Sequence, residues 1–359
     1  MTEPLLDVRD LRAAIPTEDG DVHAVNGVSF TVEPGKVLGV VGESGSGKSV
    51  TMLTLMGLTR RAGAQVSGQA LFGGQDLVTA SDRDLQRIRG NEIAMIFQDP
   101  LSSLHPFYRV GAQIIEGIRA HKDVTKKQAR ARAVELLGLV GIPKPEQRVD
   151  DYPHEFSGGM RQRVMIAMAL ANDPKLLIAD EPTTALDVTV QAQILALLER
   201  LQRELGMAVV MITHDLGVVA EIADDIVVMY AGRVVEQAPV AQLFRQPRHP
   251  YTWGLLRSIP RLDLPRDVDL VPIDGRPPSL IHLTGRCSFQ PRCPYAGGCC
   301  GADDPALEPA VANDPAHLVR CGMPEERRAR VWDALSAGRS PKEAAAAVGI
   351  GTTEEEDAA

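Results

Sequence analysis

One short segment constrains the fold of this chain more than any other: the glycine-rich run GESGSGKS at residues 42–49. It matches the pattern G-x-x-x-x-G-K-[ST]. The fixed positions of that pattern are Gly42, Gly47, Lys48 and Ser49. An apolar segment, Lys36–Val41, precedes the run, and a helical segment, Lys48–Leu58, follows it. This context favours a nucleotide-binding loop between a strand and a helix over the alternative of a surface turn that carries a lysine.

Each residue type in this loop has a physical role toward phosphate. Glycines let the backbone curl so that successive N–H groups converge on an anion, and the helix N-terminus adds partial positive charge. Lys48 would reach the β- and γ-phosphates, and Ser49 would ligate Mg²⁺. The residues expected to bind the nucleotide here are Gly42, Glu43, Ser44, Gly45, Ser46, Gly47, Lys48 and Ser49.

A phosphate loop that uses Mg²⁺ predicts an acidic strand end elsewhere, and the segment LLIADEP supplies one. Asp180 suits a contact to the metal, usually through water, and Glu181 would polarise the attacking water as a general base. For an Asp-Glu pair alone, the start of a solvated helix is the simpler interpretation. The presence of the phosphate loop in the same chain favours the catalytic one.

The rest of the pattern predicts an α/β fold in which apolar runs alternate with helical segments. The predicted strands are Lys36–Val41, Ile93–Phe97, Leu176–Ala179, Val209–Thr213 and Ile226–Tyr230. The predicted helices are Lys48–Leu58, Lys126–Leu139, Met160–Ala171 and Val190–Glu204. Unbroken apolar strands are typical of a parallel sheet that is buried on both faces. Residues 99–156 are mostly helical with prolines between, which predicts a helical insertion within the α/β core.

Further motifs resemble those of ABC-type ATPases and occur in that family's order. The segment EFSGGMRQR, residues 155–163, is similar to the signature motif and lies shortly before the Asp-Glu strand. Gln98 in IFQDP resembles the Q-loop glutamine, Asp187 in TTALD the D-loop aspartate, and His214 in ITHD the switch histidine. The resemblance covers residues 4–245 and implies a P-loop NTPase (RecA-like) core whose insertion is a helical subdomain.

This resemblance also implies which residues bind the nucleotide and which catalyse its hydrolysis. In the family, two ATP molecules lie between two cassettes, and the signature motif of one contacts the γ-phosphate held by the other. The signature residues are Ser157, Gly158 and Gly159, and Asp187 would align the site across the interface. The implied catalytic residues are Lys48, Gln98, Glu181 and His214. The implied Mg²⁺ site consists of Ser49, Gln98 and Asp180.

The sequence departs from the family pattern in two motifs. The signature carries Phe156 and Met160 where leucine and glutamine are usual, but its Ser-Gly-Gly core is intact, so we expect hydrolysis. The family often stacks adenine on an aromatic residue before the first core strand, and no aromatic residue occurs near Leu11–Ile15. The motifs therefore leave the choice between ATP and GTP open.

Beyond about Arg245 the composition changes, with dense prolines and all of the cysteines. The segments RQPRHPYT, GRPPSL and RCSFQPRCPYAGGCC resemble the C-terminal extension of ATP-binding subunits of oligopeptide/dipeptide importers, the OppD/DppD type. The resemblance implies a nucleotide-binding domain at 1–245 and the extension at 246–324. The tail at 325–359 is Ala-rich and then acidic, and we expect a short helix followed by flexible chain.

The five cysteines form one group between residues 287 and 321. Disulfides are disfavoured, because the start of the chain lacks the features of a signal peptide. The expected ligands of a bound group are Cys287, Cys293, Cys300 and Cys321. The gaps between them are five, six and twenty residues, wider than those of usual zinc pairs. The resemblance implies a [4Fe–4S] cluster, with Cys299 as the spare, and the alternatives are zinc and buried or free thiols.

The resemblance implies a subunit that binds and hydrolyses ATP to energise the import of di- or oligopeptides. No apolar run approaches the length of a membrane span, so we expect a peripheral protein at the cytoplasmic face of the cell membrane. Its expected partners are two transmembrane permease subunits, a second ATP-binding subunit of the OppF/DppF type and an extracytoplasmic peptide-binding protein.

There are three alternative functions, the first of which differs only in the cargo. The cargo could instead be nickel or another small solute, because cargo contacts lie on other chains. An ABC ATPase of DNA repair or translation is disfavoured, since no long coiled-coil insertion or second cassette is present and the formal charge of −9 argues against broad nucleic-acid binding. A non-enzymatic regulatory Fe–S protein is disfavoured by the intact Lys48, Asp180 and Glu181.

Overall fold

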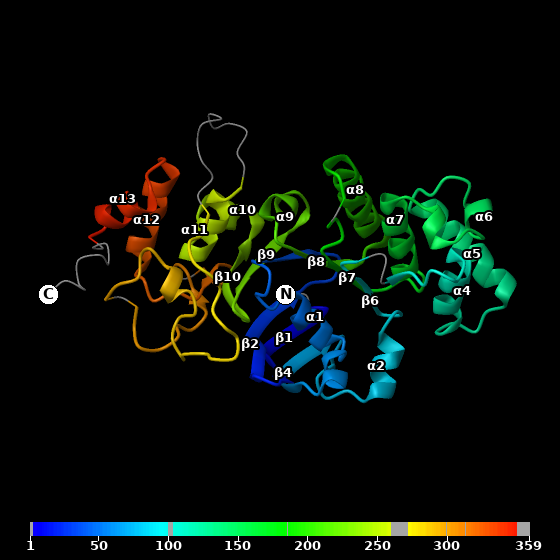
Figure 1. The fold of residues 1–359 in the computed structure, drawn as a ribbon, viewed down its shortest axis with the longest axis horizontal. Helices are drawn as coiled ribbons and strands as arrows, with labels where there is room; N and C mark the ends of the chain where they lie inside the picture. Colours follow the sequence, from blue (N-terminus) through cyan, green and yellow to red (C-terminus); the bar gives the residue numbers. More distant parts are fainter. Residues whose placement is uncertain are drawn as a thin grey trace.

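A computed structural model describes residues 3–99, 103–184, 186–259, 272–298, 300–312 and 314–349 of the chain. Figure 1 shows an elongated molecule with a sheet at its centre, the helical insertion at one end and the C-terminal helices at the other. The spare cysteine, Cys299, and the last residues, 350–359, lie outside the described residues. Among the described residues, no helix combines the length and the apolar character that crossing a membrane requires.

The central sheet contains the predicted parallel strands. Its order is β11-β12-β10-β9-β3-β8-β7-β6. The five neighbouring strands from β9 to β6 in this order are parallel to one another. The strand bounds are β3 Val37–Val41, β6 Ile93–Ile96, β7 Leu176–Asp180, β8 Ala208–Thr213, β9 Asp225–Tyr230, β10 Arg233–Pro239, β11 Glu308–Pro309 and β12 Leu318–Val319. The five predicted strands are thus confirmed, and the α/β class with them.

Both faces of this sheet are covered, which explains its unbroken apolar strands. On β3, Leu38 and Val40 pack into one core cluster, while Val37 and Val41 pack into the other. The helices on these faces are α1 Lys48–Leu55, α7 Gly158–Ala169, α8 Val188–Leu205, α9 Leu216–Ile222, α10 Val240–Arg245 and α11 Pro250–Arg257. The successive side chains of each strand therefore serve two cores.

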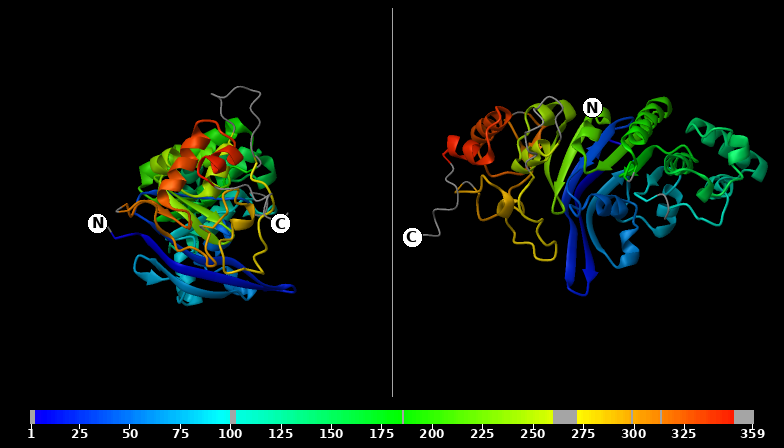
Figure 2. Two further views of the ribbon diagram at one scale, coloured as in Figure 1. Left: turned by 90° about the vertical axis from the view of Figure 1, so that its left-hand side faces the viewer. Right: turned by 45° about the horizontal axis from the view of Figure 1, so that its top comes forward.

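A second sheet, absent from the predicted elements, packs against α1 on one face of the central sheet (Figures 1 and 2). Its order is β2-β1-β4-β5. The bounds are β1 Leu6–Thr17, β2 Gly20–Val32, β4 Gln65–Phe72 and β5 Gln75–Asp76, followed by α2 Asp82–Ile88, with the turn η1 Thr59–Ala62 before β4. Leu6 and Leu11 of β1 are buried together with Met52 and Leu55 of α1. This sheet encloses the helix that leaves the phosphate loop.

The insertion between β6 and β7 is helical. It contains α4 Val110–Arg119, α5 Lys126–Leu139, α6 Pro145–Arg148 and the turn η2 Pro153–Glu155, and it leads into α7. Thr125 caps α5 through a reciprocal capping box with Gln128. Ile114 of α4, Leu136 of α5 and Val164 of α7 share one buried cluster with the central sheet. The insertion is therefore packed onto the core through α7.

The described end of the chain contains more helix than the one short helix that was expected before a flexible tail. Residues 325–349 contain α12 Glu325–Ser336 and α13 Pro341–Ala347, which follow the turn η3 Gln290–Arg292 and strands β11 and β12 in the chain. Trp253 of α11 packs with Val331 of α12 and Ala344 of α13 in a buried cluster. Small alanines share this buried cluster with the tryptophan, so a segment of low hydropathy still contributes to a core.

This packing leads to a prediction about stability. Val331 is fully buried, so Val331→Ala should lower the free energy of unfolding of the C-terminal region by about 2 kcal/mol, through lost apolar burial and the cavity left behind. Arg330→Ala, on the exposed side of the same helix, serves as the control. Denaturant titration compares the two variants. Equal stability of both would show that α12 is not packed as described.

Candidate active site

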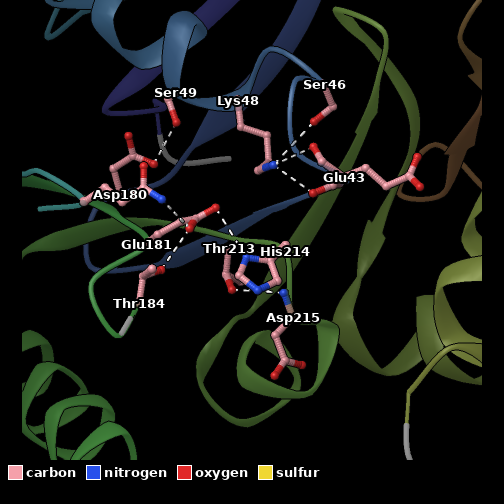
Figure 3. A network of polar contacts seen from close by, with 12 residues as sticks. Glu43, Ser46, Lys48, Ser49, Asp180, Glu181, Thr184, Thr213, His214 and Asp215 are labelled. Atoms are coloured by element: carbon pink, nitrogen blue, oxygen red, sulfur yellow. Dashed lines mark hydrogen bonds and ion pairs between the residues drawn. The ribbon is translucent and has the colours of Figure 1, made fainter. Parts of the chain in front are cut away.

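The loops that follow β3, β7 and β8 meet at one edge of the central sheet. Because these strands are parallel, their carboxyl ends lie on the same side. The phosphate loop follows β3, Asp180 ends β7, and His214 follows β8. Figure 3 shows these side chains pointing toward a common space. The topology thus assembles residues that are far apart in the sequence.

The phosphate loop turns sharply into α1 at Gly47. Its φ of 98° lies in the left-handed region, and a side chain there would collide with the carbonyl oxygen of Ala24 on β2. Only glycine meets both demands without strain. The turn leaves the first N–H groups of α1 free of a side-chain cap, as an anion-binding helix start requires.

Lys48 is buried at this turn, with 5% of its surface exposed. Its Nζ donates to the carbonyl oxygens of Gly42 (2.7 Å) and Glu43 (3.0 Å) (Figure 3). Burial lowers the pKa of the amine, and the nearby carboxylates of Glu181 and Asp180 partly oppose this. The ammonium group therefore lies in a desolvated position where a phosphate group would be a strong partner.

Ser49 and Asp180 are joined directly. The Oγ of Ser49 donates to the Oδ1 of Asp180 over 2.9 Å, and Asp180 is buried. Burial raises the pKa of this carboxyl group, and the bond from Ser49 partly counters the effect. A hydroxyl and a buried carboxylate side by side are oxygen ligands of the type that Mg²⁺ takes.

Glu181 is the centre of a polar network at the same edge. Its Oε2 accepts from Nε2 of Gln98 at 2.8 Å and from Oγ1 of Thr184 at 2.9 Å. Its Oε1 lies 3.4 Å from Nδ1 of His214, whose ring is largely exposed (Figure 3). The structure thus brings together three of the predicted catalytic residues and adds Thr184, which sequence reasoning missed.

The backbone of Glu181 adopts φ 45°, unusual for a residue with a long side chain. Its N–H donates to the carbonyl oxygen of Ile212 on β8 at 3.0 Å, which holds the turn in place. A left-handed residue directly after β7 directs the carboxylate toward Gln98 and His214. Such a strained conformation persists only where the surroundings fix it, and it is typical of functional sites.

The signature and D-loop residues lie apart from this network. Ser157 caps α7 by accepting from the N–H of Met160, and Asp187 caps α8 by accepting from the N–H of Val190. Both side chains are exposed, and Gly158 is exposed beside Ser157. Within the described part of the chain, neither side chain has a hydrogen bond to the phosphate loop. These residues are therefore free to face another molecule.

The cysteines of the C-terminal region line one cavity. Its walls include Cys287, Cys293, Cys300 and Cys321, together with His249 and the aromatic rings of Phe289 and Tyr295. Burial raises the pKa of the Cys287 and Cys293 thiols and raises that of Cys321 to about 11. Burial therefore favours the protonated form of Cys287, Cys293 and Cys321.

No set of three or more His, Cys, Asp or Glu side chains in the described residues is arranged to hold a metal ion. A single zinc ion needs its ligands converging on one point. An iron–sulfur cluster takes one thiolate at each of several irons, so its ligands can stand further apart around a cavity. The described residues thus place the four thiols around one cavity without an arrangement that would hold a metal ion.

Two family models match the chain. The model described as "ABC transporter" matches residues 25–184. The model described as "Oligopeptide/dipeptide transporter, C-terminal region" matches residues 235–300. The first covers the phosphate loop, the signature segment and the Asp-Glu strand, and the second covers three of the four cysteines that line the cavity.

Curated relatives are similar over most of the chain. The oligopeptide transport ATP-binding protein OppD of Salmonella typhimurium is 52% identical over 322 residues, which are 90% of this chain and 94% of that protein. OppD of Bacillus subtilis is 54% identical over 81% of this chain and 82% of its own length. OppD of Mycobacterium tuberculosis is 52% identical over 91% of this chain and 53% of its own length.

Solved structures share the cassette part of the fold. The ATP-binding cassette MJ0796, in a dimeric post-hydrolysis state bound to ADP and Pi, has a TM-score of 0.59 and 26% identity, covering 66% of this chain and 98% of that one. CbiO1 from Clostridium perfringens, part of the ABC transporter complex cbiONQ, has a TM-score of 0.59 and 29% identity, covering 68% of this chain and 92% of that one.

Proposed function

Since the chain belongs to the ABC transporter family, in its oligopeptide/dipeptide branch, we propose that it is the ATP-binding and ATP-hydrolysing subunit of an importer of di- and oligopeptides. One observation carries the proposal: the phosphate loop, the Ser49–Asp180 pair and the Glu181 network face one another at one edge of the sheet. This is the arrangement that phosphoryl transfer from a nucleotide to water requires.

Each residue of the network has a distinct part in hydrolysis. Lys48 leaves the loop carbonyl oxygens and binds the β- and γ-phosphates. The buried ammonium group then forms an ion pair with the phosphate. Glu181 polarises the attacking water, and Gln98 and Thr184 hold its carboxylate in place. His214, whose Nδ1 lies 3.4 Å from the Oε1 of Glu181, contacts the γ-phosphate.

Magnesium fits the site on the basis of its donor set. Ser49, Asp180 and Gln98 would hold it, and when bound it neutralises charge on the β- and γ-phosphates. Asp180 is buried, so its carboxylate is costly to keep ionised without a cation nearby. The ion and the carboxylate therefore stabilise one another.

We propose further that each complete site needs two cassettes. The exposed Ser157 and Gly158 offer a hydroxyl and N–H donors at the start of α7, where an anion is favoured. Their separation from the phosphate loop of the same chain supports contact with the ATP of a partner cassette, with Asp187 aligning the interface. The partner is a second ATP-binding subunit of the OppF/DppF type.

The remaining partners follow from the branch of the family. Two transmembrane permease subunits form the path of the peptide through the membrane, and an extracytoplasmic binding protein delivers the peptide. The chain then acts as a peripheral subunit at the cytoplasmic face of the cell membrane.

Cargo is tested most directly in a strain that lacks this chain. Uptake of labelled dipeptides, longer peptides and nickel is measured with and without the restored gene. We expect the loss and recovery of peptide uptake, with nickel uptake unchanged. Loss of nickel uptake alone would assign the subunit to a different transporter.

We also propose that the extension, residues 246–324, holds a [4Fe–4S] cluster on Cys287, Cys293, Cys300 and Cys321. The shared cavity that these four thiols line supports this assignment. When bound, the cluster supplies a covalent link between segments that are otherwise joined by few regular elements. Its role is structural.

Iron content checks this assignment. Protein purified without oxygen should contain iron and labile sulfide and be brown, because a cluster absorbs broadly in the visible range. Cys293→Ser should lose most of the iron, while Ser288→Ala, on the same segment, should retain it. Stoichiometric zinc without iron would identify a zinc site instead, and absence of both metals would leave simple thiols.

A further inference from the structure

Glu43, in the phosphate loop, is linked to the C-terminal region by both its backbone and its side chain. Its N–H donates to the hydroxyl oxygen of Tyr251 on α11 at 2.8 Å. Its carboxylate accepts two bonds from the guanidinium of Arg292, at 2.7 and 3.0 Å. Its carbonyl oxygen accepts from Lys48. The residue that holds the phosphate-binding lysine is therefore held by the C-terminal region.

Arg292 is built into this position. Its side chain is 4% exposed, whereas that of Glu43 is 29% exposed. Besides Glu43, the guanidinium donates to the carbonyl oxygens of Asp274 and Ile273, and it lies over the ring of Tyr230. Because the guanidinium of Arg292 is planar and donates to several fixed acceptors, it is held in one orientation. The carboxylate of Glu43 is thus bound to a rigid partner.

Arg292 belongs to the turn η3, which lies between two of the cavity cysteines. The N–H of Gln290 donates to the carbonyl oxygen of Cys287 at 3.0 Å, and the N–H of Cys293 donates to that of Gln290 at 3.2 Å. Phe289, the residue directly before this turn, lines the cysteine cavity and packs on Tyr251, with ring centroids 5.4 Å apart. One short turn therefore contacts both the cysteine cavity and the phosphate loop.

We propose that Arg292 is a positioning residue of the ATP site, supplied by the cysteine region, and that it sets the affinity for ATP by holding Glu43 and the phosphate loop in their binding shape. This rests on the proposed ATP-binding function but not on the identity of the group that the cysteines hold. Arg292 does not touch the reacting atoms, so its loss should change binding far more than the chemical step.

Removing the charge of Arg292 and removing the charge of Glu43 have different consequences for the partner that remains. Removal of the Arg292 charge leaves Glu43 partly exposed to water, which can solvate it. Removal of the Glu43 charge leaves the Arg292 guanidinium buried with only neutral acceptors. Arg292→Gln is therefore the cleaner test, and Glu43→Gln is expected to lower the thermal stability of the C-terminal region as well.

The experiment measures the kcat and KM of ATP hydrolysis by the assembled transporter, and the Kd of the full chain for a non-hydrolysable ATP analogue. Arg292→Gln should raise KM and Kd by roughly tenfold and change kcat by less than about twofold, the scale of a lost bidentate charged pair. Arg286→Gln, an exposed position on the same segment, should match the wild type. Arg292→Lys, which keeps the charge but not the fork, should give an intermediate KM.

A double-mutant cycle decides whether the pair acts as a unit. The Glu43→Gln, Arg292→Gln double variant should bind the analogue no more weakly than the weaker single variant. Strictly additive losses, or an unchanged KM in a folded Arg292→Gln protein, would overturn the proposal. If Arg292→Gln does not fold, Arg292→Lys with wild-type KM would overturn it. A wild-type transporter that hydrolyses no ATP would instead refute the proposed function.

Discussion

Glu181→Gln should reduce ATP hydrolysis by at least about a hundredfold while ATP binding is kept, because a general base is worth roughly that much. The amide retains hydrogen bonds to Gln98 and Thr184 but cannot take a proton from the attacking water. Since ATP is then bound without being consumed, the two-cassette assembly should accumulate in its closed form. Single-turnover hydrolysis and size measurement in the presence of ATP check both outcomes.

A matched control separates this effect from a general change in charge. Glu204→Gln, at the exposed end of α8, removes a carboxylate whose partner is the surface residue Arg200. It should leave both hydrolysis and assembly unchanged. Normal turnover in Glu181→Gln would show that another group, or water alone, accepts the proton.

Lys48→Ala should abolish nucleotide binding at concentrations that saturate the wild type, and kcat/KM should fall by more than about a hundredfold. The lysine is the buried cation of the phosphate loop, and its removal leaves the carbonyl oxygens of Gly42 and Glu43 without their donor. Equilibrium binding of a fluorescent ATP analogue measures the loss.

Lys127→Ala provides the control, since that lysine is exposed on α5. It should bind the analogue like the wild type. Retained transport in cells that carry only the Lys48→Ala chain would remove this subunit from the energising role.

The parallel strands and their loops were predictable because the signals are local. Burial on both faces gives β7 and β8 unbroken apolar sequences, and the phosphate loop carries its own glycine pattern. The carboxyl ends of such strands meet by topology, so the closeness of Asp180 to Ser49 follows from the sequence pattern plus the fold class.

The second sheet gave no comparable signal. The pairing of β1 with β2 shifts register between Val8 and Leu11 and again between Ala13 and Ile15. The buried positions change from Leu6 and Val8 to Leu11 and Ala13 across the first shift, so the alternation that would predict a long strand is broken. The left-handed backbone of Glu181 and its bond to Thr184 likewise have no marker in the sequence.

The C-terminal region shows the same limit. One short helix followed by flexible chain was expected there, because alanines such as Ala344 and Ala345 contribute little hydropathy outside the buried cluster that they form with Trp253. The ion pair of Arg292 with Glu43 joins residues 249 positions apart, and neither residue type is unusual in its own segment. Contacts of this kind are visible only once the chain is folded.

The central claim is that ATP hydrolysis by this chain drives peptide import. The most direct test reconstitutes the complete transporter in lipid vesicles and measures accumulation of a labelled oligopeptide against its concentration gradient. With the wild-type chain and ATP, we expect the peptide to accumulate. When the Glu181→Gln chain replaces the wild-type chain, with the same peptide-binding protein and permeases, accumulation should stop. Accumulation that continues with the Glu181→Gln chain, or that needs no ATP, would contradict the claim.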